Sequence, residues 1–274
     1  MSSSVFELRI RPRTGQSFDV RELWLYRELL VFLVWRDIKL RYRQTLLGGL
    51  WAILQPLIAM LLFSALFGRV AGMKTVGTPY ALFAFAGLVP WTFFANAIGL
   101  ASNSLVGSEQ MIRRIYFPRV LVPLGAIVAF GLDVLISLGF MAVLLTYYRV
   151  PASVKLFWLP VFAFGVLLVM AGLGLMLSAI NVRFRDVKYI VPFMTQMLFF
   201  VTPVIYPLSY VPGKLRFIVS LNPLTGMVEG FRYALLGSPV SSSLIMASFA
   251  TAVVFFGLGL SVFLRMETIF ADVI

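Results

Sequence analysis

The stretch from Arg36 to Gly68 constrains this chain more than any other, because a basic segment is followed directly by a long apolar one. Four cations precede the apolar run: Arg36, Lys39, Arg41 and Arg43. The next charge is Arg69, so the uncharged run spans roughly 25 residues, enough for a helix to cross a hydrocarbon layer of about 30 Å. A basic flank before an apolar span is typical of a first transmembrane helix that enters from the cytoplasm.

The composition agrees with an integral membrane protein. Hydrophobic residues make up 61% of the 274 residues and charged residues only 12%, whereas soluble domains carry about 25% charged residues. The net charge of +12 does not indicate nucleic-acid binding, because the basic residues flank apolar spans and no basic run is interleaved with exposed aromatic residues. Cysteine and histidine are absent, which excludes disulfides, thiolate chemistry and the usual zinc and haem sites.

Residues 1–43 are predicted to form a cytoplasmic tail and an amphipathic interface helix, and residues 44–274 the transmembrane domain. The tail has no recognisable cleavable signal peptide, and a short strand is expected at Val5–Ile10. From Val20 to Arg43, apolar residues recur at helical spacing with charges between them, so we expect a helix lying in the membrane interface. The alternative is a transmembrane hairpin through Leu29–Trp35, which is too short to span.

Six apolar segments are predicted to cross the membrane, with both chain ends in the cytoplasm. They cover about 45–67, 79–99, 120–148, 156–180, 189–205 and 244–264. Pro56 and Pro90 fall inside the first two, where neighbouring helices can compensate for a lost backbone donor. Gly165, Gly172 and Gly174 in the fourth segment permit close helix contact. Lys and Arg are more numerous in the segments placed inside, as the positive-inside rule requires.

The segment between spans five and six mixes apolar residues with glycine and proline. Pro203, Pro207 and Pro212 follow one another closely, and neither half between such breakers reaches spanning length. We expect a pair of short re-entrant helices that enter the membrane from outside and pack on protein. The alternative is an ordinary outer loop with one surface helix. The predicted fold class is therefore an all-α polytopic membrane protein.

The sequence lacks the residues that most membrane enzymes and ion-coupled carriers need. No Gly-x-x-x-x-Gly-Lys-Ser/Thr phosphate loop is present, so the chain has no recognisable ATPase of its own. There is no histidine and no close pair of carboxylates within a span, which argues against a membrane-embedded transferase. Asp133 is the one acid at membrane depth; it is either a proton-coupling group or, as we favour, a structural acid paired with an arginine or backbone donors. No convincing internal repeat is visible.

Several blocks resemble the permease subunits of ABC-2 type transporters, and more narrowly those that export bacterial O-antigen, capsule and teichoic acid. The blocks begin with RYRQTLLGGLWAILQPLIAMLLFSALFG and GLVPWTFFANAI. They continue with NSLVGSEQMIRRIYFPR, LSAINVRFRDVKYIVPF and LNPLTGMVEGFRYALL, in order from Arg41 to Leu236. The resemblance implies a homodimeric permease, not catalytic by itself, that pairs with two copies of a separate ATPase subunit. ATP and Mg would bind in that subunit, and this chain would hold no cofactor or metal.

The resemblance also assigns roles to particular residues. A coupling helix that docks on the ATPase would lie within Asn103–Pro118. The implied coupling residues are Asn103, Ser104, Glu109, Arg113, Arg114, Tyr116, Phe117, Pro118 and Arg119. Alternatively, this segment has no coupling role and is a solvated basic face that follows the positive-inside rule.

Three further groups are expected along the substrate route. Arg36, Arg41 and Arg43 are placed to meet a substrate phosphate at the cytoplasmic entrance, or equally well anionic lipid. Aromatic rings suit sugar faces, and the candidates on the path are Trp51, Phe63, Phe67, Phe199, Phe200 and Tyr206. Each could instead pack between helices or meet lipid. The expected outer gate comprises Asn222, Pro223, Gly226, Glu229 and Arg232, in which Glu229 and Arg232 are spaced to pair on one helix face.

Together these features predict the permease subunit of an ATP-driven exporter of lipid-linked polysaccharide in the bacterial inner membrane. Its partners would be a second copy of itself, two ATPase subunits, the lipid-linked glycan and membrane lipids. The alternatives are an ABC-2 exporter of a drug or lipid and, in another class, a membrane-embedded glycosyl- or acyltransferase.

Overall fold

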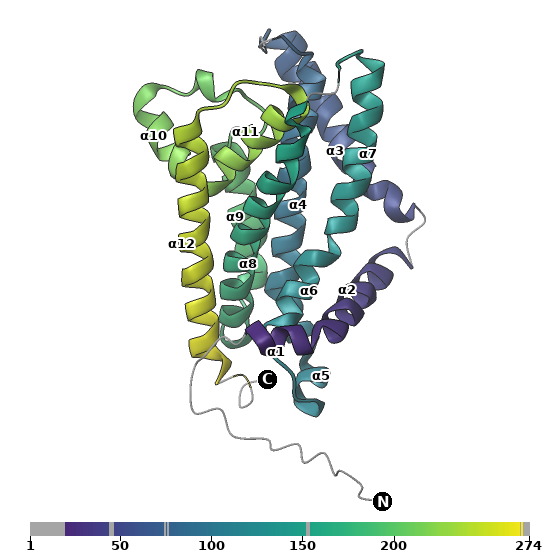
Figure 1. The fold of residues 1–274 in the computed structure, drawn as a ribbon, viewed down its shortest axis with the longest axis vertical. Helices are drawn as coiled ribbons and strands as arrows, with labels where there is room; N and C mark the ends of the chain where they lie inside the picture. The colour runs from purple at the N-terminus through teal and green to yellow at the C-terminus, as the bar shows by residue number, and fades with distance from the viewer. Residues whose placement is uncertain are drawn as a thin grey trace, which may run out of the picture.

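The structure is a computed structural model that describes residues 20–43, 47–73, 75, 77–151, 154–268 and 270. These residues form helices and turns, with no β-strand among them. The expected strand at Val5–Ile10 and the rest of the tail lie outside the described residues. Figure 1 shows an elongated helical bundle in which most long helices run roughly parallel to one axis. The predicted all-α class is therefore confirmed.

Among the described residues, five helical segments are long and apolar enough to cross a membrane: Gly48–Val70, Tyr80–Gly107, Leu121–Tyr147, Val154–Arg183 and Ser242–Glu267. They contain α3 (Trp51–Phe63), α4 (Tyr80–Gly107), α6 (Leu121–Ala129), α7 (Gly131–Tyr147), α8 (Leu159–Arg183) and α12 (Ser242–Glu267). The predicted fifth span is shorter than expected, because α9 (Val187–Val201) has 15 residues, or about 22 Å of helix. Its last predicted residues, 202–205, leave the helix as a turn.

The first and third spans are not uniform helices. A short 3-10 turn, Gly48–Leu50, precedes α3, and a π-helical segment, Ser64–Val70, follows it. Gly48 has a φ of +48°, which glycine adopts without steric cost. The third span is interrupted at Phe130, between α6 and α7. Pro56 and Pro90 lie inside α3 and α4 as predicted.

Helix α4 forms the centre of the main core, and α8 and α12 cross one another at very short range. Most of α4 from Tyr80 to Ala101 is buried, including Phe85 and Phe94 at 0% exposure. A Cβ atom on Gly259 of α12 would lie 1.9 Å from the carbonyl oxygen of Gly172 in α8. The close helix contact predicted for the glycines of the fourth span is confirmed at Gly172, because a side chain at this crossing would collide with the backbone of the other helix.

The segment before α12 contains the two short helices that were predicted, but only one of them is buried in the bundle. Helix α10 (Gly213–Leu221) is largely exposed, whereas nearly all of α11 (Pro223–Leu236) is buried against α4, α8 and α12. The alternative of an ordinary loop with a surface helix does not fit α11, which packs on protein as expected. Asn222 caps α11 through Leu224 N at 3.0 Å, and Gly237, with φ +72°, follows its last residue.

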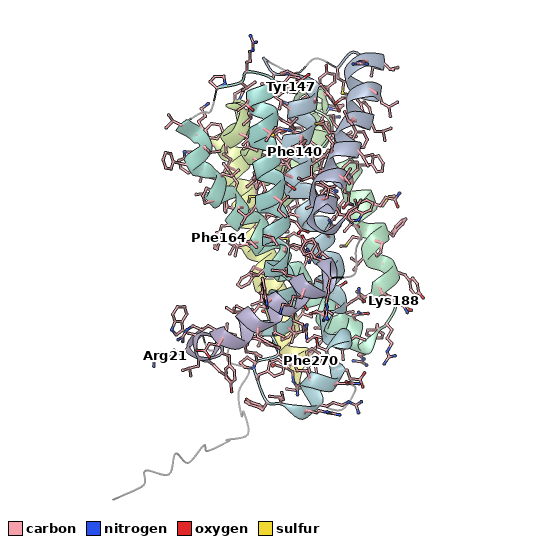
Figure 2. The ribbon with its side chains drawn as sticks, turned by 90° about the vertical axis from the view of Figure 1, so that its right-hand side faces the viewer. Arg21, Phe140, Tyr147, Phe164, Lys188 and Phe270 are labelled. Carbon is pink, nitrogen blue, oxygen red and sulfur yellow. The ribbon has the colours of Figure 1, made fainter. Side chains whose placement is uncertain are left out.

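The bundle has two distinct ends, visible in Figures 1 and 2. The α5 end carries α1 (Val20–Leu25), α5 (Glu109–Arg114), the turn at residues 184–186 and the C-terminal end of α12. The α11 end carries α10, α11 and the turn after Tyr147. Helix α2 (Arg27–Tyr42) runs obliquely beside α6 near the α5 end. The predicted interface helix is thus two helices that meet at Tyr26.

Candidate functional site: the α5 end, a polar cavity and the helix α11 clamp

Helix α5 rests on a second, smaller hydrophobic core that it shares with other helices. Ile112 and Phe117 are buried in a cluster that also includes Leu33 of α2 and Phe270 near the end of the chain. Arg119 donates to the carbonyl oxygen of Glu267 at 2.8 Å. The core therefore joins α5 to α2 and α12.

The outer surface of α5 is basic. Arg113 pairs with Glu109 at 2.9 Å across one helical turn, and Arg113, Arg114, Ile115 and Tyr116 are exposed. Of the predicted coupling residues, Phe117 and Pro118 are buried and anchor this surface. The exposed residues 113–116 therefore form a basic surface with one aromatic ring that a partner protein can contact.

Two predicted coupling residues belong to α4 rather than to α5. Helix α4 continues to Gly107, beyond the predicted end of the second span, and it includes Asn103 and Ser104. Asn103 accepts a hydrogen bond from the amide of Asn181 in α8 at 3.1 Å, and Asn181 also donates to Ser102 O at 2.9 Å. Asn181, which the sequence reasoning missed, thus joins the ends of α4 and α8 directly beside α5.

Two of the three predicted entrance arginines have carboxylate partners. Arg36 pairs with the buried Asp37 at 2.8 Å. Arg41 pairs with Asp133 of α7 at 2.8 Å and lies 3.4 Å from the centre of the Phe130 ring. Arg43 is exposed. The expectation that Asp133 is paired with an arginine is confirmed.

Tyr42 completes the group around Asp133 by donating its hydroxyl hydrogen bond to the carboxylate. Burial, and then the neighbouring Asp133 carboxylate, raise the pKa of Tyr42 to about 12, so the phenol stays protonated at neutral pH. Neither Tyr42 nor the Arg41–Asp133 pairing was singled out from the sequence, because the partners are 91 and 92 residues apart.

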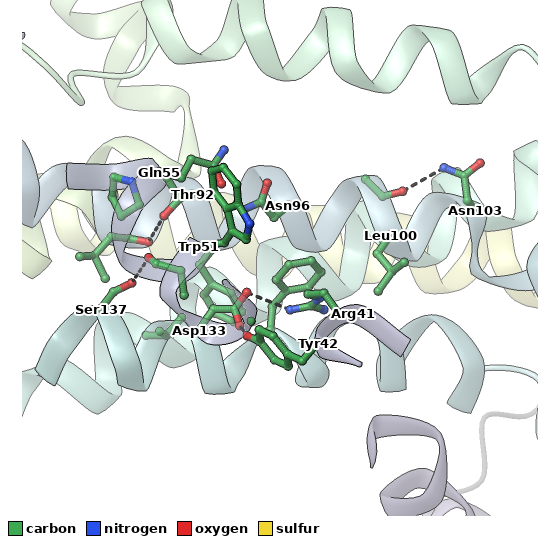
Figure 3. Close-up of a pocket in the computed structure, with 18 residues that line it drawn as sticks. Arg41, Tyr42, Trp51, Gln55, Thr92, Asn96, Leu100, Asn103, Asp133 and Ser137 are labelled. Carbon is green, nitrogen blue, oxygen red and sulfur yellow. Dashed lines mark hydrogen bonds and ion pairs between the residues drawn. The ribbon is translucent and has the colours of Figure 1, made fainter. Parts of the chain in front are cut away.

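A cavity of about 520 Å³ opens beside this group, between α3, α4 and α7. Trp51 and Gln55 of α3 and Thr92 and Asn96 of α4 line this cavity (Figure 3). Ser137 of α7 donates to Ala52 O at 3.0 Å and ties α7 to α3. We refer to this space as the α3–α4–α7 cavity.

Four of the six predicted path aromatics meet in one cluster nearer the α11 end. The ring centroids of Phe63 and Phe67 are 6.0 Å apart, those of Phe63 and Phe199 are 5.7 Å apart, and those of Phe199 and Phe200 are 5.5 Å apart. Trp91 of α4, which was not predicted, lies 5.4 Å from Phe199. The cluster therefore brings together α3, α4 and α9.

The other two predicted aromatics lie elsewhere. Trp51 lines the α3–α4–α7 cavity, and the Tyr206 hydroxyl bonds to the carbonyls of Phe200 and Val201 at the end of α9. Tyr206 therefore holds the turn that follows α9.

The residues expected at the outer gate hold α11 in place. Arg232 is fully buried and donates to the carbonyls of Phe83, Pro203 and Val204 at 3.3, 2.7 and 2.5 Å. It also pairs with Glu229 at 2.8 Å, which confirms the expected pair.

The remaining gate residues also make contacts within the fold. The amide of Asn222 donates to the Thr202 hydroxyl at 2.8 Å, and the backbone N–H of Gly226 donates to Ser248 Oγ at 3.1 Å. Pro223 is buried in the first turn of α11. We call the Arg232 contacts the α11 clamp.

No group of three or more metal-ligating carboxylate side chains occurs within the part of the chain that the structure describes. With cysteine and histidine absent from the whole sequence, the described residues offer hydrogen bonding, aromatic contact and paired charge.

Comparison with known proteins places the chain among transport permeases. The sequence profile of ABC-2 type transporters matches residues 28–236. An O-antigen export system permease of Klebsiella pneumoniae is 28% identical over 248 residues, covering 90% of this chain and 95% of the relative. One from Myxococcus xanthus is 35% identical, covering 78% and 82%. A polysialic acid transport protein of Escherichia coli is 25% identical, covering 82% and 89%.

Proposed function

Because this chain belongs to the ABC-2 type transporter family, we propose that it is the membrane subunit of an ATP-driven exporter of lipid-linked polysaccharide. The glycan would be an O-antigen, a capsule or a teichoic acid, moved across the bacterial inner membrane. The observation that carries this proposal is the near full-length similarity to permeases named for O-antigen export.

The proposed partner at the α5 end is a separate ATPase subunit, which would bind ATP and Mg. The absence of a phosphate loop from this sequence agrees with ATP binding on another chain. Two permease copies and two ATPase subunits would form the transporter. ATP-driven closure of the ATPase pair would push on α5, and the small core around Ile112 and Phe117 would pass that movement to α2 and α12.

The proposed route for the glycan runs beside α3 and α9. Much of α3 is exposed, including Ile58, Leu61 and Leu62, and much of α9 is exposed as well. These surfaces are available to a second copy of the chain and to the substrate. The aromatic cluster of Phe63, Phe199 and their neighbours would offer flat apolar faces to sugar rings without reading a particular sequence of sugars.

The lipid-linked phosphate would enter near the α5 end and meet the exposed Arg43, because Arg36 and Arg41 pair with Asp37 and Asp133. This end would face the cytoplasm, because its segments carry the larger share of lysine and arginine. Both chain termini would then be cytoplasmic, and residues 20–43 would form the interface element before the transmembrane domain.

Deletion of the gene in its host tests the proposal. We expect surface polysaccharide to disappear and lipid-linked glycan to accumulate inside the cell, with both effects reversed by the intact gene. Purified permease should bind ATP only together with its ATPase subunit. Unchanged surface glycan after deletion, or sugar transfer by the permease without any ATPase, would refute the assignment.

A further inference from the structure

The α3–α4–α7 cavity contains polar side chains that the proposed path of aromatic residues does not use. Gln55 lies in the first span and Asn96 in the second, in segments that are otherwise strongly apolar. Both side chains line the cavity. Among the described residues, neither amide has a hydrogen-bond partner.

An unpaired amide within a membrane span is costly unless something polar meets it. A hydrocarbon chain offers no donor or acceptor, so a lipid tail in this cavity would leave both amides unsatisfied. The physical consequence is that the cavity suits water or a polar ligand. Its volume of about 520 Å³ lies within the ~300–1,000 Å³ typical of small-molecule sites.

The charges in the cavity point to a neutral ligand. Among the described residues that line it, Arg41 and Asp133 alone are charged, and they pair with each other at 2.8 Å. The net charge of the lining is therefore zero.

The remaining lining groups match the surface of a sugar ring. Trp51 and Gln55 are four residues apart and therefore share one face of α3, while Thr92, Asn96 and Asn103 follow one stripe of α4. Trp51 is 52% exposed, so its ring is open for contact with pyranose C–H groups. The amides of Gln55 and Asn96 each offer donors and acceptors to hydroxyl groups.

We propose that the α3–α4–α7 cavity is a binding site for a short, uncharged segment of the glycan, held by Trp51, Gln55 and Asn96. This inference rests on the proposed function and adds to it a sugar site inside each protomer. The site lies on the α5 side of the aromatic cluster. A glycan chain would therefore meet directional amide contacts first and flat aromatic faces afterwards.

A photo-crosslinking experiment in intact cells tests which molecule occupies the cavity. The change is Trp51→p-benzoylphenylalanine, and the control is Val143→p-benzoylphenylalanine on an exposed position of α7 outside the cavity. We expect an adduct that stains for carbohydrate at position 51 only, and only in cells that synthesise the glycan. Adducts with phospholipid alone or with a second permease copy alone, or no carbohydrate adduct, would overturn the proposal.

A second measurement uses near-isosteric apolar replacements in the complete transporter. Gln55→Met and Asn96→Leu each remove the amide while keeping the approximate side-chain size. We expect each to lower the export rate about two- to tenfold, as loss of one hydrogen bond predicts, at unchanged permease level and ATPase association. Ser261→Ala, which removes an exposed hydroxyl of α12, should leave export unchanged. Normal export by the Gln55→Met and Asn96→Leu double variant would contradict the site.

Failure of this inference and failure of the proposed function give different results. If deletion of the gene leaves surface glycan unchanged, the proposed function itself is wrong. If deletion abolishes surface glycan but the crosslink and the amide variants behave like their controls, the exporter stands and the cavity has another occupant.

Discussion

Replacing Arg232 should destabilise the protein more than any other single change of a charged residue at the α11 end. The Arg232→Met variant keeps much of the apolar stem and removes the guanidinium. That group is at 0% exposure, and its hydrogen bonds connect α11 to α4 and to the turn after α9. The substitution leaves Glu229, whose side chain is 12% exposed, without its cation.

The expected magnitude follows from these contacts. Removing one partner of a buried ion pair costs about 3–5 kcal/mol, because the other charge remains buried. For a protein of this size, each kcal/mol shifts the melting temperature by roughly 2–4 °C. We therefore expect Arg232→Met to melt roughly 6–20 °C below the parent protein. The melting temperature of Arg232→Lys should lie between those of Arg232→Met and the parent protein. The lysine ammonium keeps the charge but lacks the planar guanidinium that reaches several carbonyls.

Melting curves in detergent, followed by the loss of the monodisperse peak in size-exclusion chromatography, measure this effect. Lys214→Met on the exposed α10 is the control and should stay within about 2 °C of the parent, as surface changes usually do. If Arg232→Met also melts within about 2 °C of the parent, the α11 clamp does not stabilise the fold and the reasoning is refuted.

Three further predictions concern other parts of the molecule. Gly259→Ala should lower the free energy of unfolding by about 1–3 kcal/mol or more, because the new Cβ would meet a carbonyl of α8 at 1.9 Å. Gly257→Ala, with open space around it, is the control, and equal melting of the two would contradict the close crossing. Asp133→Asn should cost about 1–3 kcal/mol in the same melting assay; an unchanged melting temperature would show that its ion pair is dispensable. Arg114→Ala should reduce co-purification of the ATPase several-fold, whereas Arg69→Ala should not; equal recovery would remove α5 from the contact.

The spans could be predicted from the sequence because each depends on local composition. A long apolar run, its basic flank and the glycines at Gly165, Gly172 and Gly174 are all readable without knowledge of the fold. The Glu229–Arg232 pair could be predicted for the same reason, since its spacing places both residues on one helix face. The length of α9 could not, because apolar residues continue past Val201 although the helix stops there.

The candidate site was less predictable, because its contacts join distant parts of the chain. Arg232 was expected at a gate, yet its acceptors are backbone carbonyls of Phe83, Pro203 and Val204. Any residue carries such a carbonyl, so no side-chain pattern marks it. Gln55 and Asn96 are different: an amide inside an apolar span is visible in the sequence and could have marked the cavity.

The first span faces two different neighbours along its length. Trp51, at the start of α3, lines the cavity with α4 and α7, whereas Phe63, at its end, contacts Phe199 of α9. Twelve helical residues separate these two side chains, which turns the second by about 120° around the axis relative to the first. Rotation of α3 about its axis would therefore change both surfaces at once. A rotation that widens the cavity would also change how the aromatic edges meet α9, so the two expected glycan contacts are coupled through α3.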